Sequence, residues 1–200
     1  MKRLVISVAL AAIAAGCFNE PTPAYKTVPE GARLYLQDKS LKDLSDYRDA
    51  LKPELVDYVN LDRNELEVFP PELLSLSGLK WLRLNGNSLS VLPDDLSGLE
   101  KLRRIYLKGN RFTEVPAALK SLPSLTDADL SGNPIETVPQ WLVDKKGLEN
   151  VSFSDTRVRK LPDDLSGWAT LTSLQLGGLA ISADEMKRIR TSLPKVTVVF

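Results

Sequence analysis

The leucines of this chain recur at a spacing that is neither helical nor strictly alternating. In the stretch LKWLRLNGNSLSVLPDDLSG they occupy positions 79, 82, 84, 89, 92 and 96. The same frame restarts every 23 residues, at Val56, Leu79, Leu102, Leu125, Leu148 and Leu171. A fixed period of this length predicts an array of repeats, in which each copy buries its apolar side chains only against its neighbours.

Within each copy, the apolar fourth and sixth places predict a short strand with one face turned inward, as at Leu82 and Leu84. The third and fifth places then face outward, and successive strands lie in parallel about 4.8 Å apart. A proline at the fifteenth place, such as Pro93, breaks regular hydrogen bonding where the chain starts across the opposite side. Short helical turns are expected there.

The ninth place of several copies is an asparagine. Asn87, Asn110 and Asn133 each follow a glycine, and Asn64 follows Arg63 at the equivalent place. Because the chain turns inward here, a buried side-chain amide can bond backbone groups that water does not reach. We therefore expect these asparagines to be structural.

These copies resemble leucine-rich repeats, from about Gly31 to Phe200. The resemblance implies an α/β fold: a leucine-rich-repeat solenoid with a curved parallel sheet on the concave face and short helical turns or loops on the convex face. The expected organisation is a signal peptide at 1–16, a lipidated cysteine and proline-containing tether at 17–30, an N-terminal capping repeat at 31–55, five 23-residue repeats at 56–170, and a degenerate C-terminal repeat with its cap at 171–200.

The two ends depart from the repeat pattern, as capping units do. At the N-terminal end, SDYRDALKPEL (45–55) is expected to form a helical cap. Near the other end, Ser182 and Glu185 fit a capping box that starts a helix, and a last strand is expected at 196–200. Thr156 stands in place of the asparagine, and Lys145 takes a leucine place, in the later copies.

Composition excludes several kinds of chemistry. The chain has 200 residues, 26 basic and 26 acidic side chains, one cysteine and no histidine. Without histidine, the commonest general base and most zinc or iron sites are ruled out, and the charge balance indicates no nucleic-acid partner. The paired acids at 94–95 and 163–164 recur at the place where acids favour the start of a helical turn. We expect no enzyme activity, no metal and no cofactor.

The N-terminus, MKRLVISVALAAIAAGC, has the basic start and short apolar run of a secretory signal. Its last four residues resemble the lipobox of bacterial lipoproteins, with Ala14 where that family usually has leucine. The resemblance implies cleavage before Cys17, lipid attachment to Cys17 and a place in the bacterial cell envelope, with Phe18 favouring the outer membrane of a Gram-negative cell. The alternative is an ordinary signal peptide cut nearby, which would leave a free thiol.

The outward places of neighbouring strands form two columns across the repeats. The third places are Arg33, Tyr58, Trp81, Arg104, Asp127, Asn150, Ser173 and Lys195, and the fifth places are Tyr35, Asn60, Arg83, Tyr106, Asp129, Ser152, Gln175 and Thr197. Tyrosine, tryptophan and arginine are enriched in binding hot spots. The candidate ligand-binding residues on the concave face are therefore Tyr58, Trp81, Arg83, Arg104 and Tyr106, with Asp127 and Asp129 as an acidic border.

The expected partner is another protein, with the membrane reached through the lipid anchor. One alternative is a carbohydrate or cell-wall ligand stacked on Tyr58, Trp81 and Tyr106, because flat aromatic rings also suit sugar faces. Another is a structural envelope protein. In that case the exposed aromatic and charged residues only stabilise the strands and pair with each other.

Overall fold

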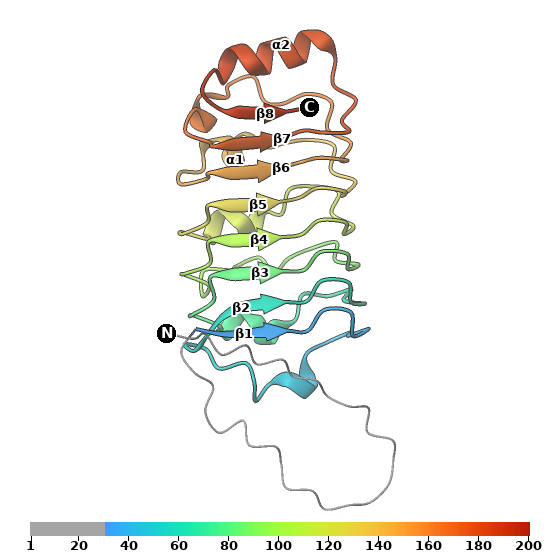
Figure 1. Cartoon of the computed structure of the whole chain (residues 1–200), viewed down its shortest axis with the longest axis vertical. Helices are drawn as coiled ribbons and strands as arrows, with labels where there is room; N and C mark the ends of the chain where they lie inside the picture. Colours follow the sequence, from blue (N-terminus) through green and yellow to red (C-terminus); the bar gives the residue numbers. More distant parts are fainter. Residues whose placement is uncertain (1–30) are drawn as a thin grey trace, which may run out of the picture.

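The computed structural model of the protein describes residues 31–200. It contains a single eight-stranded parallel sheet in the order β1-β2-β3-β4-β5-β6-β7-β8, so each strand pairs with the next one along the chain (Figure 1). The strands are β1 (Ala32–Tyr35), β2 (Val56–Asn60), β3 (Trp81–Arg83), β4 (Arg104–Tyr106), β5 (Asp127–Asp129), β6 (Asn150–Ser152), β7 (Ser173–Gln175) and β8 (Thr197–Val199). This stack of strands is the parallel sheet that the repeat pattern predicts.

The strand register follows the 23-residue period across the central repeats. Tyr58 pairs with Trp81, Trp81 with Arg104, and Arg104 with Asp127. The last strand departs from the prediction, because Thr197 and not Lys195 pairs with Ser173, while Val199 pairs with Gln175. The intervening segment holds the ten-residue helix α2 (Ala183–Ser192), and the register spacing from Ser173 to Thr197 is 24 residues, one more than the repeat period.

A single apolar core runs the length of the stack. Within each central strand the middle residue is buried and its two neighbours are half-buried, as in β3, where Leu82 is 0 % exposed. The leucines that define the repeat frame, among them Leu79, Leu84, Leu89 and Leu96, are also 0 % exposed. Because every coil shares this interior with the next, burial of apolar surface couples the coils to one another.

Short helical segments cross the side opposite the strands (Figure 1). They are the 3₁₀ helices η1 (Ser45–Tyr47), η2 (Pro71–Ser75), η3 (Ala117–Ser121) and η4 (Ser166–Trp168), and the α-helix α1 (Gln140–Asp144). Three of them directly follow a repeat proline, as expected: η2 follows Pro70, η3 follows Pro116 and α1 follows Pro139. The expected helical cap at 45–55 was wrong in extent, since only the three residues of η1 are helical and Pro53 disfavours helix at the residue before it.

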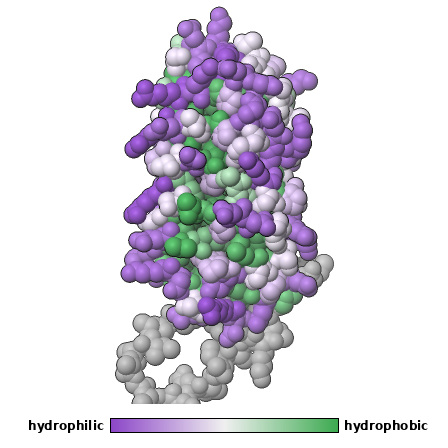
Figure 2. Space-filling view, turned by 180° about the vertical axis from the view of Figure 1, so that it is seen from behind, coloured by the Kyte–Doolittle hydropathy of each residue, from purple (hydrophilic) through white to green (hydrophobic). Residues whose placement is uncertain are grey.

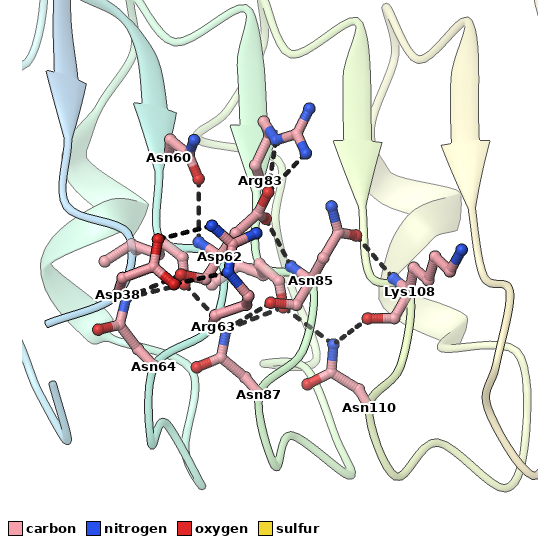
Figure 3. Close-up of polar contacts among 12 residues, drawn as sticks. Asp38, Asn60, Asp62, Arg63, Asn64, Arg83, Asn85, Asn87, Lys108 and Asn110 are labelled. Atoms are coloured by element: carbon pink, nitrogen blue, oxygen red, sulfur yellow. Dashed lines mark hydrogen bonds and ion pairs between the residues drawn. The ribbon is translucent and has the colours of Figure 1, made fainter. Parts of the chain in front are cut away.

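The buried asparagines form a ladder that links successive coils (Figure 3). Asn110 donates from Nδ2 to the carbonyl of Leu84 in the preceding coil, at 2.9 Å, and to that of Leu107 in its own coil, at 2.9 Å. Its Oδ1 accepts from the backbone N–H of Leu89 at 3.0 Å. Asn64, Asn87 and Asn133 make equivalent bonds. The prediction of structural asparagines is confirmed.

The residue before each ladder position has a left-handed backbone. Gly109 and Gly132 have φ of 65° and 63°, and a Cβ on Gly132 would lie 3.4 Å from the backbone nitrogen of Gly109. Arg63 and Asp155 take the same conformation at the equivalent places, with φ of 54° and 57°. The Asn85-Gly86 pair therefore turns the chain inward and does not form a hairpin.

The ladder ends at Thr156, whose hydroxyl donates to the carbonyl of Phe153 within its own coil at 2.7 Å. Lys145, in a leucine place of the same region, donates from Nζ to the carbonyl of Leu122 at 2.7 Å, and burial lowers its pKa. Trp168 is fully buried and donates from Nε1 to the carbonyl of Leu142. Polar substitutions inside these coils are thus accommodated by backbone carbonyls.

The C-terminal cap is α2, which lies beyond β8 at the end of the stack (Figure 1). Ser182 caps the helix by accepting from the N–H of Glu185 at 3.2 Å, as predicted. The carboxylate of Glu185 instead accepts from the N–H of Leu161 at 2.9 Å and from Arg188, which lowers its pKa. The expected reciprocal capping box is therefore only half formed, because this carboxylate bonds the neighbouring coil.

Residues 1–30, with the expected signal peptide, the lipid-attachment residue Cys17 and the tether, lie outside the described residues. Between residues 31 and 200 the structure has no helix that is both long and apolar enough to span a membrane.

We predict that Asn110→Ala lowers the free energy of unfolding by about 2 kcal/mol or more, because the buried N–H of Leu89 loses its partner and the carbonyls of Leu84 and Leu107 each lose one of their two asparagine donors. Asn85→Ala serves as the matched control, since its side chain accepts one exposed bond from the N–H of Lys108 and its loss should cost less than about 1 kcal/mol. Urea unfolding followed by far-UV circular dichroism measures both. Equal effects of the two substitutions would refute the structural role of the ladder.

Candidate functional site

The outward side chains of the sheet form one continuous surface, here called the strand face, on the side toward the viewer in Figure 1. Its two columns are in register on neighbouring strands, so that Tyr58, Trp81 and Arg104 are side by side, as are Arg83 and Tyr106. All five side chains are half-buried. The structure therefore places these five predicted ligand-binding residues next to one another on one surface.

Aromatic rings run across the first three strands. The ring centroids of Tyr35 and Tyr58 are 5.3 Å apart with a tilt of 46°, and those of Tyr58 and Trp81 are 6.0 Å apart with a tilt of 66°. Burial raises the pKa of the Tyr58 phenol. These contacts fix the rings against one another, at spacings typical of favourable aromatic pairs.

Three arginines lie over these rings. The guanidinium carbon of Arg104 is 4.5 Å from the centroid of Trp81, and that of Arg83 is 5.3 Å from the centroid of Tyr106. Arg33 lies 5.6 Å from the centroid of Tyr58 and 5.8 Å from that of Trp81. We call this set the aromatic–arginine cluster; its members are Arg33, Tyr35, Tyr58, Trp81, Arg83, Arg104 and Tyr106.

Arg83 is also part of a buried polar network at the end of β3 (Figure 3). Its Nε donates to Oδ2 of Asp62 at 2.7 Å, and Oδ1 of Asp62 accepts from the N–H of Asn85 at 2.8 Å. The side chain of Asp62 is only 4 % exposed, whereas that of Arg83 is 37 % exposed. Arg83 therefore neutralises a buried carboxylate in addition to facing solvent.

The predicted acidic border is present on β5. Asp127 lies 3.4 Å from Nε of Arg104 and accepts from the side-chain amide of Asn150 at 2.8 Å. Asp129 accepts from the N–H of Ser131 at 3.0 Å and from its hydroxyl. Small polar side chains follow on β6 and β7, and together with Tyr106 they line a shallow hollow of about 250 Å³.

Sequence reasoning missed three participants of this surface. Arg33 and Tyr35 were placed in the outward columns but not among the binding residues, although the register now puts them against Tyr58. Asp62 lies in the turn after β2 and outside both columns, so its pairing with Arg83 had no signal in the column pattern. Arg33 and Tyr35 could have been found from the sequence, because they occupy the third and fifth places directly before those of Tyr58 and Asn60.

The contacts also bear on the alternatives. Arg83 and Arg104 pair with acids and the aromatic residues touch across strands, as expected if the surface only stabilises the sheet. For sugar stacking, the rings of Tyr58 and Trp81 are tilted by 66° and do not form a flat platform. Arg104 further occupies a face of Trp81. The geometry thus disfavours a stacked sugar at Trp81.

The opposite side of the molecule shows apolar residues along its middle, between hydrophilic margins (Figure 2). Val68 and Val91, at equivalent places of two repeats, are 71 % and 68 % exposed. The paired acids act locally, since Asp95 accepts from the N–H of Ser97 at 2.7 Å and Asp164 from that of Ser166 at 2.8 Å. Within residues 31–200, no group of cysteine, aspartate and glutamate side chains is arranged to hold a metal ion.

Comparison with known proteins identifies the type of repeat. Residues 55–112 match the family model described as leucine rich repeat. A solved leucine-rich-repeat protein of Leptospira interrogans is similar to this chain, with 28% sequence identity and a TM-score of 0.70, over 84% of this chain and 48% of that protein. The chain therefore spans about half the length of that protein. No curated protein matches the chain.

The predicted fold class is confirmed: the chain forms a leucine-rich-repeat solenoid with a parallel sheet. The same findings support a bacterial leucine-rich-repeat protein. As many as 353 solved chains match this fold, so the fold by itself does not select a ligand. The particular side chains on the strand face must do that.

We predict that Arg83→Ala lowers the free energy of unfolding by about 2 kcal/mol, because it leaves the buried carboxylate of Asp62 without its cation. Arg104→Ala should cost less than about 1 kcal/mol, since its side chain is 40 % exposed and its pairing with Asp127 is loose. Urea denaturation of the two variants measures the difference. If Arg104→Ala were the more destabilising, the assignment of the structural role to Arg83 would be wrong.

Proposed function

We propose that this chain is an envelope-anchored binding protein that recognises another protein through the aromatic–arginine cluster. Leucine-rich-repeat folds generally mediate protein–protein interaction. The observation that carries the proposal is that large aromatic side chains and arginines gather on adjoining strands and remain accessible to solvent. These residue types bury much area per side chain and also supply hydrogen-bond donors.

The cluster has the further advantage of being preorganised. Trp81 contacts Tyr58 on one neighbouring strand and Arg104 on the other, so its ring is already held before a partner arrives. Ordering side chains at an interface costs about 0.5–1.5 kcal/mol for each flexible one, and this cost is reduced when the side chains support each other. A rigid sheet with fixed side chains therefore favours tight recognition.

The lipid anchor is the second part of the proposal. Its support is the sequence before residue 31: a basic start, a short apolar run, and small residues directly before Cys17. Lipid on Cys17 would hold the repeats near a bacterial membrane, through the proline-containing segment 18–30. The proposed place is the outer membrane if the cell is Gram-negative.

We predict that Cys17→Ser abolishes metabolic labelling of the chain with a radioactive fatty acid, because the thiol that accepts the lipid is removed. Phe18→Asp provides the control, since it keeps Cys17 and should keep the label. Labelling is read from the immunoprecipitated chain expressed in a bacterium that processes lipoproteins. Persistent label on the serine variant would rule out Cys17 as the anchor.

We predict that the double variant Trp81→Ala, Arg104→Ala loses the proteins that the wild-type chain captures from bacterial envelope extract. Neither residue has a role in the core, and both contribute contact area to the cluster. Pull-down followed by mass spectrometry measures the loss. Circular dichroism verifies that the variant is folded.

The matched control is the double variant Val91→Ala, Arg111→Ala. It removes one apolar side chain and one arginine from the exposed surface away from the strands. It should capture the same proteins as the wild type. An unchanged set of captured proteins with the Trp81 and Arg104 variant would contradict the proposal. Glycan-array binding that disappears with this variant would favour the carbohydrate alternative.

A further inference from the structure

Arg33 differs from the other two arginines of the aromatic–arginine cluster. Arg83 is paired with Asp62, and Arg104 with Asp127. Among residues 31–200, by contrast, no carboxylate lies within ion-pair distance of Arg33, and its recorded contacts are the rings of Tyr58 and Trp81. One guanidinium of the strand face is therefore positioned by aromatic rings and is not neutralised by any acid of the described residues.

No side chain in the described part of the protein accepts a hydrogen bond from Arg33, which leaves its donors available there to a ligand. A guanidinium carries five N–H donors in a planar fork, which matches the two oxygens of a carboxylate. Contact with an aromatic ring orients this fork but satisfies none of its donors with an oxygen acceptor. Arg33 is half-buried, so a charge-assisted bond made there would be less weakened by solvent than one made at a fully exposed arginine.

The acids of the strand face define where an anionic group can bind. Asp127 and Asp129 lie on β5, and β6 and β7 add only neutral polar side chains, while Asp57 at the start of β2 is paired with Lys80 at 3.9 Å. The arginines, in contrast, lie on β1, β3 and β4. An anionic partner is therefore attracted to the β1 end of the strand face and repelled at β5.

The surface beside Arg33 is aromatic. Tyr35 lies on the same strand as Arg33 and Tyr58 on the adjoining strand β2; their ring centroids are 5.3 Å apart, and they offer apolar area within reach of the same ligand. Recognition of a carboxylate and an adjoining apolar group together fits a protein segment better than an isolated anion, because neighbouring residues of a peptide supply both.

We infer that the partner of the strand face presents an aspartate or glutamate side chain to Arg33, with an apolar residue of the same segment packed on Tyr35 and Tyr58. This inference rests on the proposed function and specifies its partner. The carboxylate completes the charge pairing of the cluster, and the flanking apolar residue covers the exposed ring surface. The polarity of the face then fixes the direction in which the segment lies across the strands.

The test is selection from a library of random dodecapeptides displayed on phage, with the whole chain immobilised. Peptides that bind the wild type should be enriched in acidic residues next to apolar ones. Selection on Arg33→Gln should lose the acidic enrichment. Selection on Arg159→Gln, which removes an exposed arginine outside the strands, should retain it.

A double-mutant cycle then tests whether the carboxylate of the peptide binds Arg33 directly. For one synthetic peptide from the selected set, Glu→Gln in the peptide and Arg33→Gln in the chain should each weaken binding about tenfold, and the two together no further. Equal and additive losses would show that the carboxylate bonds another residue and would overturn the inference. Arg33-dependent binding to phosphatidylglycerol vesicles in place of peptides would also overturn it, since the anion would then be a lipid phosphate.

The outcomes also separate this inference from the proposed function. If peptides are selected by the wild type and lost with the Trp81→Ala, Arg104→Ala variant but show no acidic enrichment, the strand face binds protein and the inference about Arg33 is wrong. If the wild type selects no more peptides than that variant does, both are wrong.

Discussion

The structure depends on satisfying backbone groups at the place where each coil turns away from the sheet. The carbonyls of Leu84 and Leu107 and the N–H of Leu89 lie in an apolar interior, where an unpaired polar group costs about 1–3 kcal/mol. One asparagine amide has two donors and an acceptor, so it can satisfy all three from a single position. This small, repeated interaction allows the leucines to close a continuous core without leaving polar atoms unsatisfied.

The strand face follows from that constraint. Because the coils are held in register, each outward residue is placed beside its counterpart one period away, and residues 23 apart become neighbours. Tyr58, Trp81 and Arg104 thus meet on three strands, although they are dispersed in the sequence. The same regularity explains why charged side chains on this surface pair across coils, as Arg104 does with Asp127.

The period alone predicted much of this architecture, since the strands, the inward leucines and the buried asparagines all repeat with it. What the sequence could not predict depends on contacts outside the period. The last strand is shifted because α2 lengthens the preceding segment, and the carboxylate of Glu185 bonds Leu161 in a neighbouring coil in place of its own helix N-terminus. In the candidate site, the column pattern placed the aromatic residues and arginines correctly on one face. It did not distinguish Arg83, which neutralises Asp62 in a turn, from Arg33, which has no acidic partner among the described residues.

The end of the asparagine ladder at Thr156 divides the solenoid energetically. Up to Asn133, each rung donates to a carbonyl of the preceding coil as well as of its own, whereas Thr156 bonds only within its coil. The coils beyond this point are joined to the rest by sheet pairing, by apolar contact, by the bond of the Arg157 N–H to the carbonyl of Ile135 and by that of Trp168 Nε1 to the carbonyl of Leu142. Local opening of a solenoid is governed by such coupling between neighbouring units. Amide hydrogen exchange should therefore divide the chain into two foldons, with the boundary between β5 and β6 and the faster-exchanging amides on the C-terminal side.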